Sequence, residues 1–244
     1  MKAIITGAGS GIGREVVSML VGMGYEVWAL GRRQEALVET AHLSGSPDQV
    51  HVLSADVASA ESMKNALGNL SFDVLVASAG ICKQASLDDP NADEVWREVM
   101  STNVDGVWNT FRSARLNDNG RAVVVSSGLG KNARAHYTAY TASKHAVLGM
   151  TKCFALELAE RGIRVNAVCP GWVDTTMSRG DLVRTAQENG TTPEAEYAAA
   201  VEPIALKRFV MPAEVSQLIG FLVSDASSAI TGQSYNISCG EFFG

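Results

Sequence analysis

The feature that most constrains the fold is an alternation of short apolar runs with longer segments of helical period. Most of the runs are continuously apolar rather than alternately apolar and polar, which is typical of parallel strands covered on both faces. The predicted strands are residues 2–6, 26–30, 49–54, 72–77, 121–126, 163–168 and 233–237, and the main predicted helices are residues 12–22, 91–115, 138–160 and 213–223. This order predicts right-handed βαβ units and an α/β fold with a doubly wound parallel sheet of seven strands.

Length and composition favour one domain. The chain has 244 residues, of which 46% are apolar, which is enough for a full core in a single domain over residues 1–244. The net charge of −6 is mild and no Lys/Arg-rich run occurs, so we expect no nucleic-acid partner. No run of about 18 apolar residues occurs and the N-terminus has no signal-peptide core, which predicts a soluble, cytoplasmic protein without a membrane partner.

The cysteines and histidines show no ligand spacing. Cys82, Cys153, Cys169 and Cys239 are far apart in the sequence, and the four histidines form no HExxH-type pair. Neither a zinc site nor a disulfide framework is therefore indicated. We predict ordinary buried thiols and no metal.

One segment interrupts the alternation. Residues 176–211 contain no predicted strand and lie between the sixth predicted strand and the last predicted helix. Because a connection of this length in a compact domain is usually functional, we predict a substrate lid with helices of its own. The alternative is a surface insertion without a role.

A glycine-rich turn follows the first predicted strand directly. Gly7, Gly11 and Gly13 give the pattern G-x-x-x-G-x-G at the start of the first predicted helix, with Ser10 and Ile12 in the same turn. Residues without a Cβ atom let the backbone approach a pyrophosphate, and a helix N-terminus offers free N–H groups and a partial positive charge. The position predicts a dinucleotide site, whereas the turn by itself is equally compatible with a plain strand-to-helix connection.

The end of the second predicted strand indicates which dinucleotide is bound. Enzymes that bind NAD usually place an acidic residue there to accept hydrogen bonds from the ribose hydroxyls. Here Gly31 occupies that position and is followed by Arg32 and Arg33. Since guanidinium groups bind a phosphate well, NADP is favoured over NAD. The alternative is that both arginines are only the solvated start of the next helix.

Tyr140 and Lys144 are four residues apart in a predicted helix and therefore share one face. A phenol has a pKa near 10, and a nearby ammonium group would stabilise its phenolate for proton exchange with a carbonyl or alcohol oxygen. Ser127 follows a predicted strand and could hold the same oxygen. By itself this spacing is common, and a core tyrosine beside a surface lysine is the default interpretation.

Several motifs taken together resemble the short-chain dehydrogenase/reductase family over essentially the whole chain. They are "TGAGSGIG" (6–13), Asp56-Val57, "STNVDG" (101–106), "VVVSSG" (123–128), "YTASK" (140–144), "RVNAVCPGWVDT" (164–175) and "TGQSYNI" (231–237). The resemblance implies a single-domain Rossmann fold and a catalytic set of Asn103, Ser127, Tyr140 and Lys144. It implies that Tyr140 is the general acid/base and that Ser127 orients the carbonyl. It further implies that Lys144 lowers the tyrosine pKa and binds the nicotinamide ribose, and that Asn103 supports a proton-relay water.

The resemblance also implies the remaining contacts. Asp56 and Val57 would flank the adenine, and Val173 and Thr175 would flank the carboxamide. Ala79 and Gly80 would approach the cofactor closely, and Pro170 and Gly171 would also bind it. For the substrate pocket we predict Leu129, Trp172, Met177 and Leu182, although ordinary packing under the lid is an equal alternative. Two stretches depart from the family pattern. "ASAG" (77–80) lacks the two usual asparagines, which puts the local bracing of the sheet in doubt, and "NISCG" (236–240) replaces the usual Asn-Val-Asp-Gly-Gly.

Residues 137–175 look most like β-ketoacyl carrier-protein reductases and aromatic polyketide ketoreductases. The leading hypothesis is thus an NADP(H)-dependent oxidoreductase acting on a ketone/secondary-alcohol pair. The alternatives are an NAD-dependent dehydrogenase of an alcohol or diol, and a cofactor-sensing protein without turnover. Apolar residues on two predicted helices, together with the resemblance, predict a homotetramer; they are Val104, Val107, Trp108, Phe111, Val147, Met150, Phe154 and Leu158.

Overall fold

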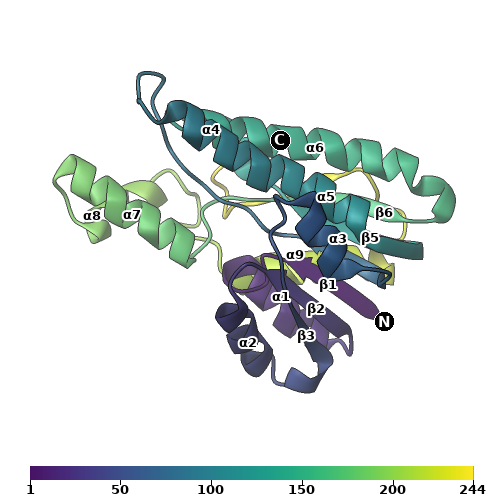
Figure 1. Cartoon of the computed structure of the whole chain (residues 1–244). Helices are drawn as coiled ribbons and strands as arrows, with labels where there is room; N and C mark the ends of the chain where they lie inside the picture. The colour runs from purple at the N-terminus through teal and green to yellow at the C-terminus, as the bar shows by residue number, and fades with distance from the viewer. Residues whose placement is uncertain (244) are drawn as a thin grey trace.

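Seven parallel strands form one sheet in the order β3-β2-β1-β4-β5-β6-β7 (Figure 1). The computed structural model describes residues 1–243, which leaves only Gly244 of the predicted domain outside it. The strands are β1 (Lys2–Thr6), β2 (Glu26–Gly31), β3 (Val50–Ser54), β4 (Ser71–Ala77), β5 (Arg115–Val125), β6 (Arg164–Pro170) and β7 (Ser234–Ile237). The predicted doubly wound sheet of seven strands is confirmed.

The strand order reverses beside β1. β2 and β3 follow one another on one side of β1, and β4 pairs with the other side of β1. Ala3 of β1 therefore lies between Val27 of β2 and Val74 of β4. Connections from the carboxyl ends of β1 and β4 therefore diverge and leave a crevice between them. In open parallel sheets this crevice is where ligands bind.

Helices cover both faces of the sheet, and two helices project beyond its carboxyl end (Figure 1). α1, α2 and α9 pack on one face, α3 to α6 cover the other, and α7 and α8 form the projection. The helices are α1 (Gly11–Gly22), α2 (Gln34–Leu43), α3 (Ala60–Leu67), α4 (Ala92–Met100), α5 (Gly106–Ser113), α6 (Thr138–Glu157), α7 (Thr176–Asn189), α8 (Pro193–Val201) and α9 (Pro212–Val223).

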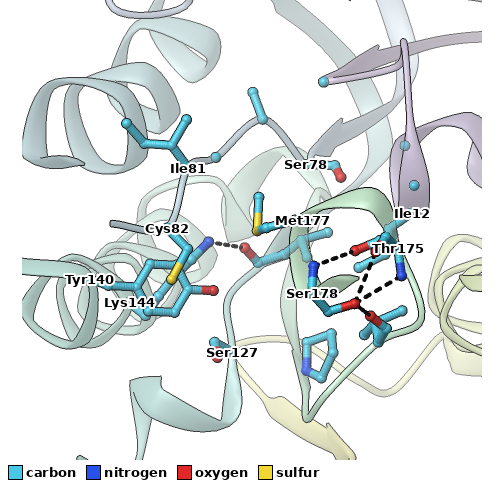
Figure 2. Close-up of a pocket in the computed structure, with 18 of the residues that line it drawn as sticks. Ile12, Ser78, Ile81, Cys82, Ser127, Tyr140, Lys144, Thr175, Met177 and Ser178 are labelled. Atoms are coloured by element: carbon cyan, nitrogen blue, oxygen red, sulfur yellow. Dashed lines mark hydrogen bonds between the residues drawn. The ribbon is translucent and has the colours of Figure 1, made fainter. Parts of the chain in front are cut away.

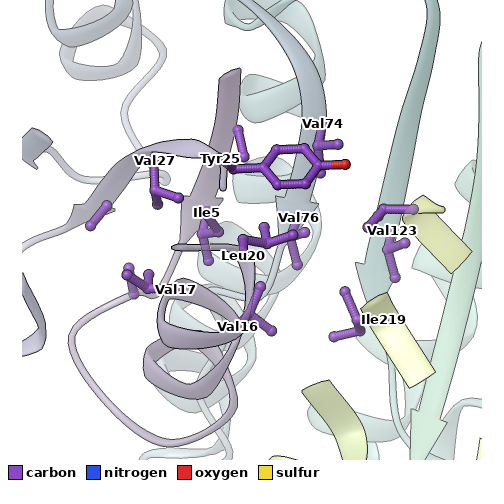
Figure 3. Packing of buried hydrophobic residues seen from close by; sticks show 14 of the residues in the cluster. Ile5, Val16, Val17, Leu20, Tyr25, Val27, Val74, Val76, Val123 and Ile219 are labelled. Atoms are coloured by element: carbon purple, nitrogen blue, oxygen red, sulfur yellow. The ribbon is translucent and has the colours of Figure 1, made fainter. Parts of the chain in front are cut away.

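Two apolar cores, one on each face, explain why the strands are apolar throughout. On one face, Leu20 of α1 and Ile219 of α9 pack with Ile5 and Val76 of the sheet (Figure 3). On the other face, side chains of α3, α5 and α6 pack against β1, β4 and β5. Each fully buried side chain of this size contributes about 1.5–3 kcal/mol to folding. A strand between two such cores has no solvent-facing side on which polar residues would alternate.

Two predicted boundaries differ from the structure by three residues or more. β5 begins at Arg115 rather than at residue 121, because Arg115 and Leu116 pair with Ser71 and Phe72 before a register shift in β4. The polar residues 117–119 interrupt the apolar pattern there and hid the pairing from a sequence-based prediction. The predicted helix 138–160 ends as α6 at residue 157 and is followed by a short 3-10 turn.

The predicted helix 91–115 consists of three parts. α4 and α5 are separated by a π-helical turn over Ser101–Asp105, which widens the helix by one residue per turn. Such turns often occur at functional sites, and this one carries Asn103. The prediction of one continuous helix over residues 91–115 is therefore wrong.

The predicted lid contains α7 and α8 and has a small core of its own. Leu182 of α7 is buried against Ile204 and Phe209, with Trp172 packed beside them. An isolated parallel bridge joins Val173 to Val210 and closes the base of the lid. The lid is thus a helical excursion whose two ends meet at the sheet. None of the described helices is long and apolar enough to cross a membrane.

Candidate active site

A cavity of about 530 Å³ opens at the carboxyl end of the sheet, between the first turn of α1 and the lid. It extends from Arg32 and Arg33 at the end of β2 to Trp172 at the base of the lid. The predicted residues that line it are Gly7, Ser10, Gly11, Ile12, Gly13, Arg32, Arg33, Asp56, Val57, Ala79, Gly80, Ser127, Leu129, Tyr140, Lys144, Pro170, Gly171, Trp172, Val173, Thr175 and Met177. The structure therefore brings all but two of the predicted residues into one space.

The glycines of the first turn have no room for a side chain. A Cβ atom on Gly7 would lie 2.7 Å from Cα of Ala79, and one on Gly13 would lie 2.3 Å from the carbonyl oxygen of Gly7. Gly7 and Gly11 also have positive φ angles of 69° and 52°. Ser10 precedes α1 without a side-chain cap, so the N–H groups of the first turn remain for a ligand. These features fit a dinucleotide pyrophosphate at the N-terminus of α1.

Thr6 takes over the bracing that the missing asparagines would supply. Its hydroxyl oxygen accepts hydrogen bonds from the backbone N–H groups of Ser78 and Ala79, each at 3.2 Å. These bonds hold the segment after β4 close to Gly7, where the cavity narrows. The doubt about the "ASAG" stretch is therefore resolved by a side chain from β1 rather than from β4.

Two arginines line the end of the cavity next to β2. Arg32 and Arg33 are exposed and both line the cavity. Arg33 also precedes α2 in an extended conformation, so it is at the same time the solvated start of the next helix. The carboxylate of Asp56 accepts a hydrogen bond from the N–H of Ala58 at 3.0 Å, which fixes the loop after β3.

Ser127 and Tyr140 form the polar centre of the cavity (Figure 2). Ser127 comes after the end of β5, where its hydroxyl oxygen accepts a hydrogen bond from the N–H of Leu129 at 3.1 Å. This leaves its own proton available for donation, and the Ser127 hydroxyl acts to lower the pKa of the nearby Tyr140 phenol. An oxygen placed between the two hydroxyls would be held by two donors at once.

Lys144 is a buried cation beside this pair. Its residue is 6% exposed, and Nζ donates to the carbonyl oxygen of Val125 at 2.9 Å and lies 5.6 Å from the centre of the Tyr140 ring. Burial lowers the pKa of Lys144 to about 8. Burial also raises the pKa of Tyr140, and the negative charge that Cys82 would carry adds to this effect. Burial thus dominates the pKa of Tyr140 in the protein alone, and the expectation that Lys144 lowers this pKa stays a prediction.

Asn103 and Leu182 are the two predicted site residues outside the cavity lining. Asn103 is buried behind it, where its side-chain amide donates to the carbonyl oxygen of Ile81 at 2.9 Å and to Ser143 at 3.0 Å. Its oxygen accepts from the N–H of Ile81 at 2.9 Å. The side chain thus braces the loop after β4 against α6. Leu182, predicted as a substrate contact, packs in the lid core instead because it faces Ile204 and Phe209.

Several lining residues were not predicted. The hydroxyl of Tyr137 donates to Oδ2 of Asp181 at 3.3 Å and accepts from the amide of Gln84, and Arg184 donates to Oδ1 of Asp181 at 2.9 Å. Burial raises the pKa of Tyr137 to about 12. Tyr137 is the N-cap residue of α6, three residues before Tyr140, a spacing that could have revealed it. Further unpredicted lining residues are Cys82, Arg134, Glu241 and Phe242.

The cysteines do not all behave as predicted. Cys169 is buried, whereas Cys153 is exposed and Cys82 lines the cavity beside Tyr140 and Lys144 (Figure 2). Burial raises the pKa of the Cys82 thiol to about 12. Within residues 1–243, no group of three or more His, Cys, Asp or Glu side chains is placed to hold a metal ion.

Comparisons with known proteins agree with this geometry. The short chain dehydrogenase family model matches residues 1–184. A putative ketoacyl reductase of the monensin polyketide synthase from Streptomyces virginiae is 37% identical over 98% of this chain and 95% of its own length. A 3-oxoacyl-(acyl-carrier-protein) reductase from Thermotoga maritima is 36% identical over 97% of this chain and 96% of its own length.

Among solved structures, a variant of actinorhodin polyketide ketoreductase with NADPH superposes with a TM-score of 0.91. It is 31% identical and covers 98% of this chain and 96% of its own. The match thus covers nearly the whole of both chains. Fold, site and sequence agree that this chain belongs to the short-chain dehydrogenase/reductase family, as an oxidoreductase that acts on a CH–OH/ketone pair with NAD(P).

Proposed function

We propose that the protein is an NADPH-dependent ketoreductase, and that its substrates are β-ketoacyl compounds or related ketones. One observation carries the proposal: a single cavity joins the Ser127–Tyr140–Lys144 centre to an end with Arg32 and Arg33, where Gly31 stands at the position of the usual ribose-binding carboxylate. A carboxylate there would repel a 2′-phosphate, while guanidinium groups attract it. The names of the relatives, which are ketoacyl and polyketide ketoreductases, support the ketone substrate.

The proposed mechanism assigns a proton transfer to Tyr140. When bound, the dinucleotide supplies the reducing equivalent for the carbonyl carbon. The hydroxyl of Ser127 donates a hydrogen bond to the carbonyl oxygen and fixes its position beside the phenol. Tyr140 then gives its proton to that oxygen as negative charge develops on it, so that the ketone becomes a secondary alcohol and Tyr140 a phenolate. Lys144 lies close enough to offset this phenolate charge.

Asn103 is proposed as a positioning residue. Its three side-chain hydrogen bonds connect the loop after β4 to Ser143, which lies on α6 between Tyr140 and Lys144. It therefore holds the helix that carries the proton donor against the cofactor-binding loop. Leu129, Trp172 and Met177 are proposed as the apolar substrate contacts, since all three line the cavity beyond the polar centre.

The test measures turnover by the purified enzyme for a substrate matrix. β-Keto esters, β-ketoacyl thioesters and simple ketones are assayed with NADPH or NADH, and secondary alcohols with NADP or NAD. The proposal predicts ketone-dependent oxidation of NADPH in preference to NADH. A clear preference for NAD with an alcohol would favour a catabolic dehydrogenase. Binding of a cofactor without turnover of any substrate would favour a cofactor-sensing protein.

A homotetramer is proposed on narrower grounds than the sequence suggested. Val107, Val147 and Phe154, which were counted as surplus apolar surface, are buried within the monomer. Trp108 of α5 and Leu156 of α6 remain 51% and 79% exposed, and the two helices lie side by side (Figure 1). Exposed apolar side chains of this size favour a self-complementary contact. Light scattering should give about four times the chain mass of 25.8 kDa, and a mass near one chain would contradict the proposal.

A further inference from the structure

The C-terminal residues of the chain return to the catalytic centre. After β7, Cys239 and Gly240 have positive φ angles of 54° and 81° and turn the chain back toward the cavity. Glu241 and Phe242 both line the cavity, together with Ser127 and Trp172. Phe243, the next residue, is 85% exposed. Two adjacent phenylalanines thus have opposite environments, one at the site and one in solvent.

Specific contacts hold this C-terminal segment (238–243) in place. Oε2 of Glu241 accepts a hydrogen bond from the N–H of Trp172 at 3.2 Å, and Oε1 lies 3.8 Å from the guanidinium of Arg134. The carboxylate side chain is only 17% exposed. The turn before it is attached to the lid, because the carbonyl oxygen of Cys239 accepts from the N–H of Leu206 at 3.0 Å. The segment is therefore anchored at the base of the lid and is not a loose end.

Phe242 packs directly against the residue that follows Ser127. A Cβ atom on Gly128 would lie 1.8 Å from Cζ of Phe242, so the ring edge occupies the space that any larger residue at 128 would need. Gly128 is buried, and its φ is not in the left-handed region. Close approach of the ring, rather than backbone conformation, is therefore what excludes a side chain at this position.

The position of the ring restricts the substrate. A carbonyl oxygen held between the hydroxyls of Ser127 and Tyr140 directs one of its two substituents toward Ser127 and Gly128, where the Phe242 ring lies. The other substituent has the space toward Met177, which lies on the opposite side of the Tyr140 hydroxyl from Ser127 (Figure 2). The two substituents therefore meet very different amounts of room.

We propose that Phe242 is a specificity-determining residue that limits the substituent beside Ser127 to a small group such as methyl. The substrate class is then a ketone flanked by one small and one larger group. Glu241 is the positioning residue that keeps the ring at the site through Trp172. The inference rests on the proposed ketoreductase function, which supplies the orientation of the carbonyl.

The experiment compares kcat/KM for three ethyl esters at saturating NADPH: 3-oxobutanoate, 3-oxopentanoate and 4-methyl-3-oxopentanoate. In the wild type, each carbon added beside the carbonyl should lower kcat/KM by about tenfold or more, because a pocket wall discriminates methylene groups to this extent. Phe242→Ala should raise kcat/KM for the branched ester by about tenfold or more, with Phe242→Leu in between. Phe243→Ala is the matched control and should keep the wild-type profile.

Two results would overturn the inference. One is turnover by Phe242→Ala with the same size profile as the wild type, and the other is an equal loss on all three esters, which would mean that the ring only supports the fold. Absence of NADPH oxidation with every ester and variant would instead overturn the proposed function and the inference with it.

A second measurement tests the packing without any turnover. Gly128→Ala should lower the thermal unfolding temperature strongly in the wild type, because its Cβ would overlap the Phe242 ring. In the Phe242→Ala background the same change should cost much less, since neighbouring sites that share one space are not additive. Losses that simply add would show that the ring does not lie against Gly128, and would overturn the proposal.

Discussion

Replacing Lys144 by Met should make the protein more stable and inactive at the same time. Lys144 is an almost fully buried ammonium whose pKa falls from its ordinary value of 10.5 to about 8 because burial disfavours the charge. At 1.36 kcal/mol per pKa unit, keeping it charged in the folded protein costs roughly 3 kcal/mol. Met has a similar length and no charge. Losing the bond to the Val125 oxygen costs about 1 kcal/mol, so the net gain at pH 7 is about 2 kcal/mol.

The pH dependence separates this cause from general repacking. Below about pH 8 the lysine is charged in both the folded and the unfolded protein, so the full cost is present. Between about 8 and 10.5 the folded protein gives up the proton while the unfolded chain keeps it, and wild-type stability therefore rises with pH in this window. The Met variant lacks the titrating group and should not show this rise. At pH 9.5 less than half of the free-energy cost of the buried charge remains, and the difference in unfolding free energy between wild type and the Met variant should nearly vanish.

The assay is urea unfolding of wild type and Lys144→Met at pH 7 and pH 9.5, with Lys152→Met as a control on the exposed side of α6. The control should leave stability almost unchanged at both pH values. A Lys144→Met variant that is less stable than wild type at pH 7, or whose stability difference is the same at both pH values, would refute the reasoning.

Two further predictions follow from the cofactor end of the cavity and one from the loop after β4. The Gly31→Asp variant should fold, because the new Cβ atom would lie 3.4 Å from Leu37 and the backbone at this position is unstrained. The variant should lower kcat/KM with NADPH by about 10- to 150-fold and should improve kcat/KM with NADH. Arg32→Leu should raise the KM for NADPH and leave that for NADH nearly unchanged; equal changes for both cofactors would contradict the assignment. Thr6→Val should lower the free energy of unfolding, measured by thermal unfolding, by about 1–3 kcal/mol, because the N–H groups of Ser78 and Ala79 lose their acceptor. Thr6→Ser keeps a hydroxyl and should retain most of the wild-type stability.

The sheet and the cavity position of most candidate site residues could be predicted because their signals are local. Each central strand is a short apolar run with a core on both faces, and the glycine turn and the pair Tyr140–Lys144 are fixed by spacing within one element. Ser127 comes two residues after the end of β5, so its place at the carboxyl edge of the sheet follows from the order of the elements. Such features depend on neighbours in the sequence, which a single chain displays directly.

The other parts of the site depend on contacts between distant segments. Leu182 lies on α7 at a spacing compatible with either face, and only the position of Ile204 and Phe209 determines that it turns inward to the lid. Phe242 and Phe243 are indistinguishable by composition, and the turn at Cys239 and Gly240 decides which ring reaches the cavity. The bracing by Thr6 likewise joins β1 to a loop more than 70 residues later. No local pattern encodes these pairings.

The pKa of Tyr140 shows that sequence spacing alone does not predict the electrostatics of a buried group. The sequence places an ammonium one turn away, which suggests a lowered tyrosine pKa. The structure buries both groups, and the loss of solvation raises the pKa of the phenol above its ordinary value. A phenol that stays protonated at neutral pH is suited to donate its proton to a ketone, which agrees with the proposed direction of reduction.

The most direct test of the account is turnover by Tyr140→Phe. The change removes one hydroxyl and leaves the ring, the hydroxyl of Ser127 and the glycine turn in place. With NADPH and the best ketone from the substrate matrix, kcat should fall by 10² or more, within the range for general acid catalysis. NADPH binding, followed by its fluorescence, should remain within a few-fold of the wild type. A Tyr140→Phe enzyme that keeps most of its ketone-dependent NADPH oxidation would contradict the central claim that this phenol is the proton donor.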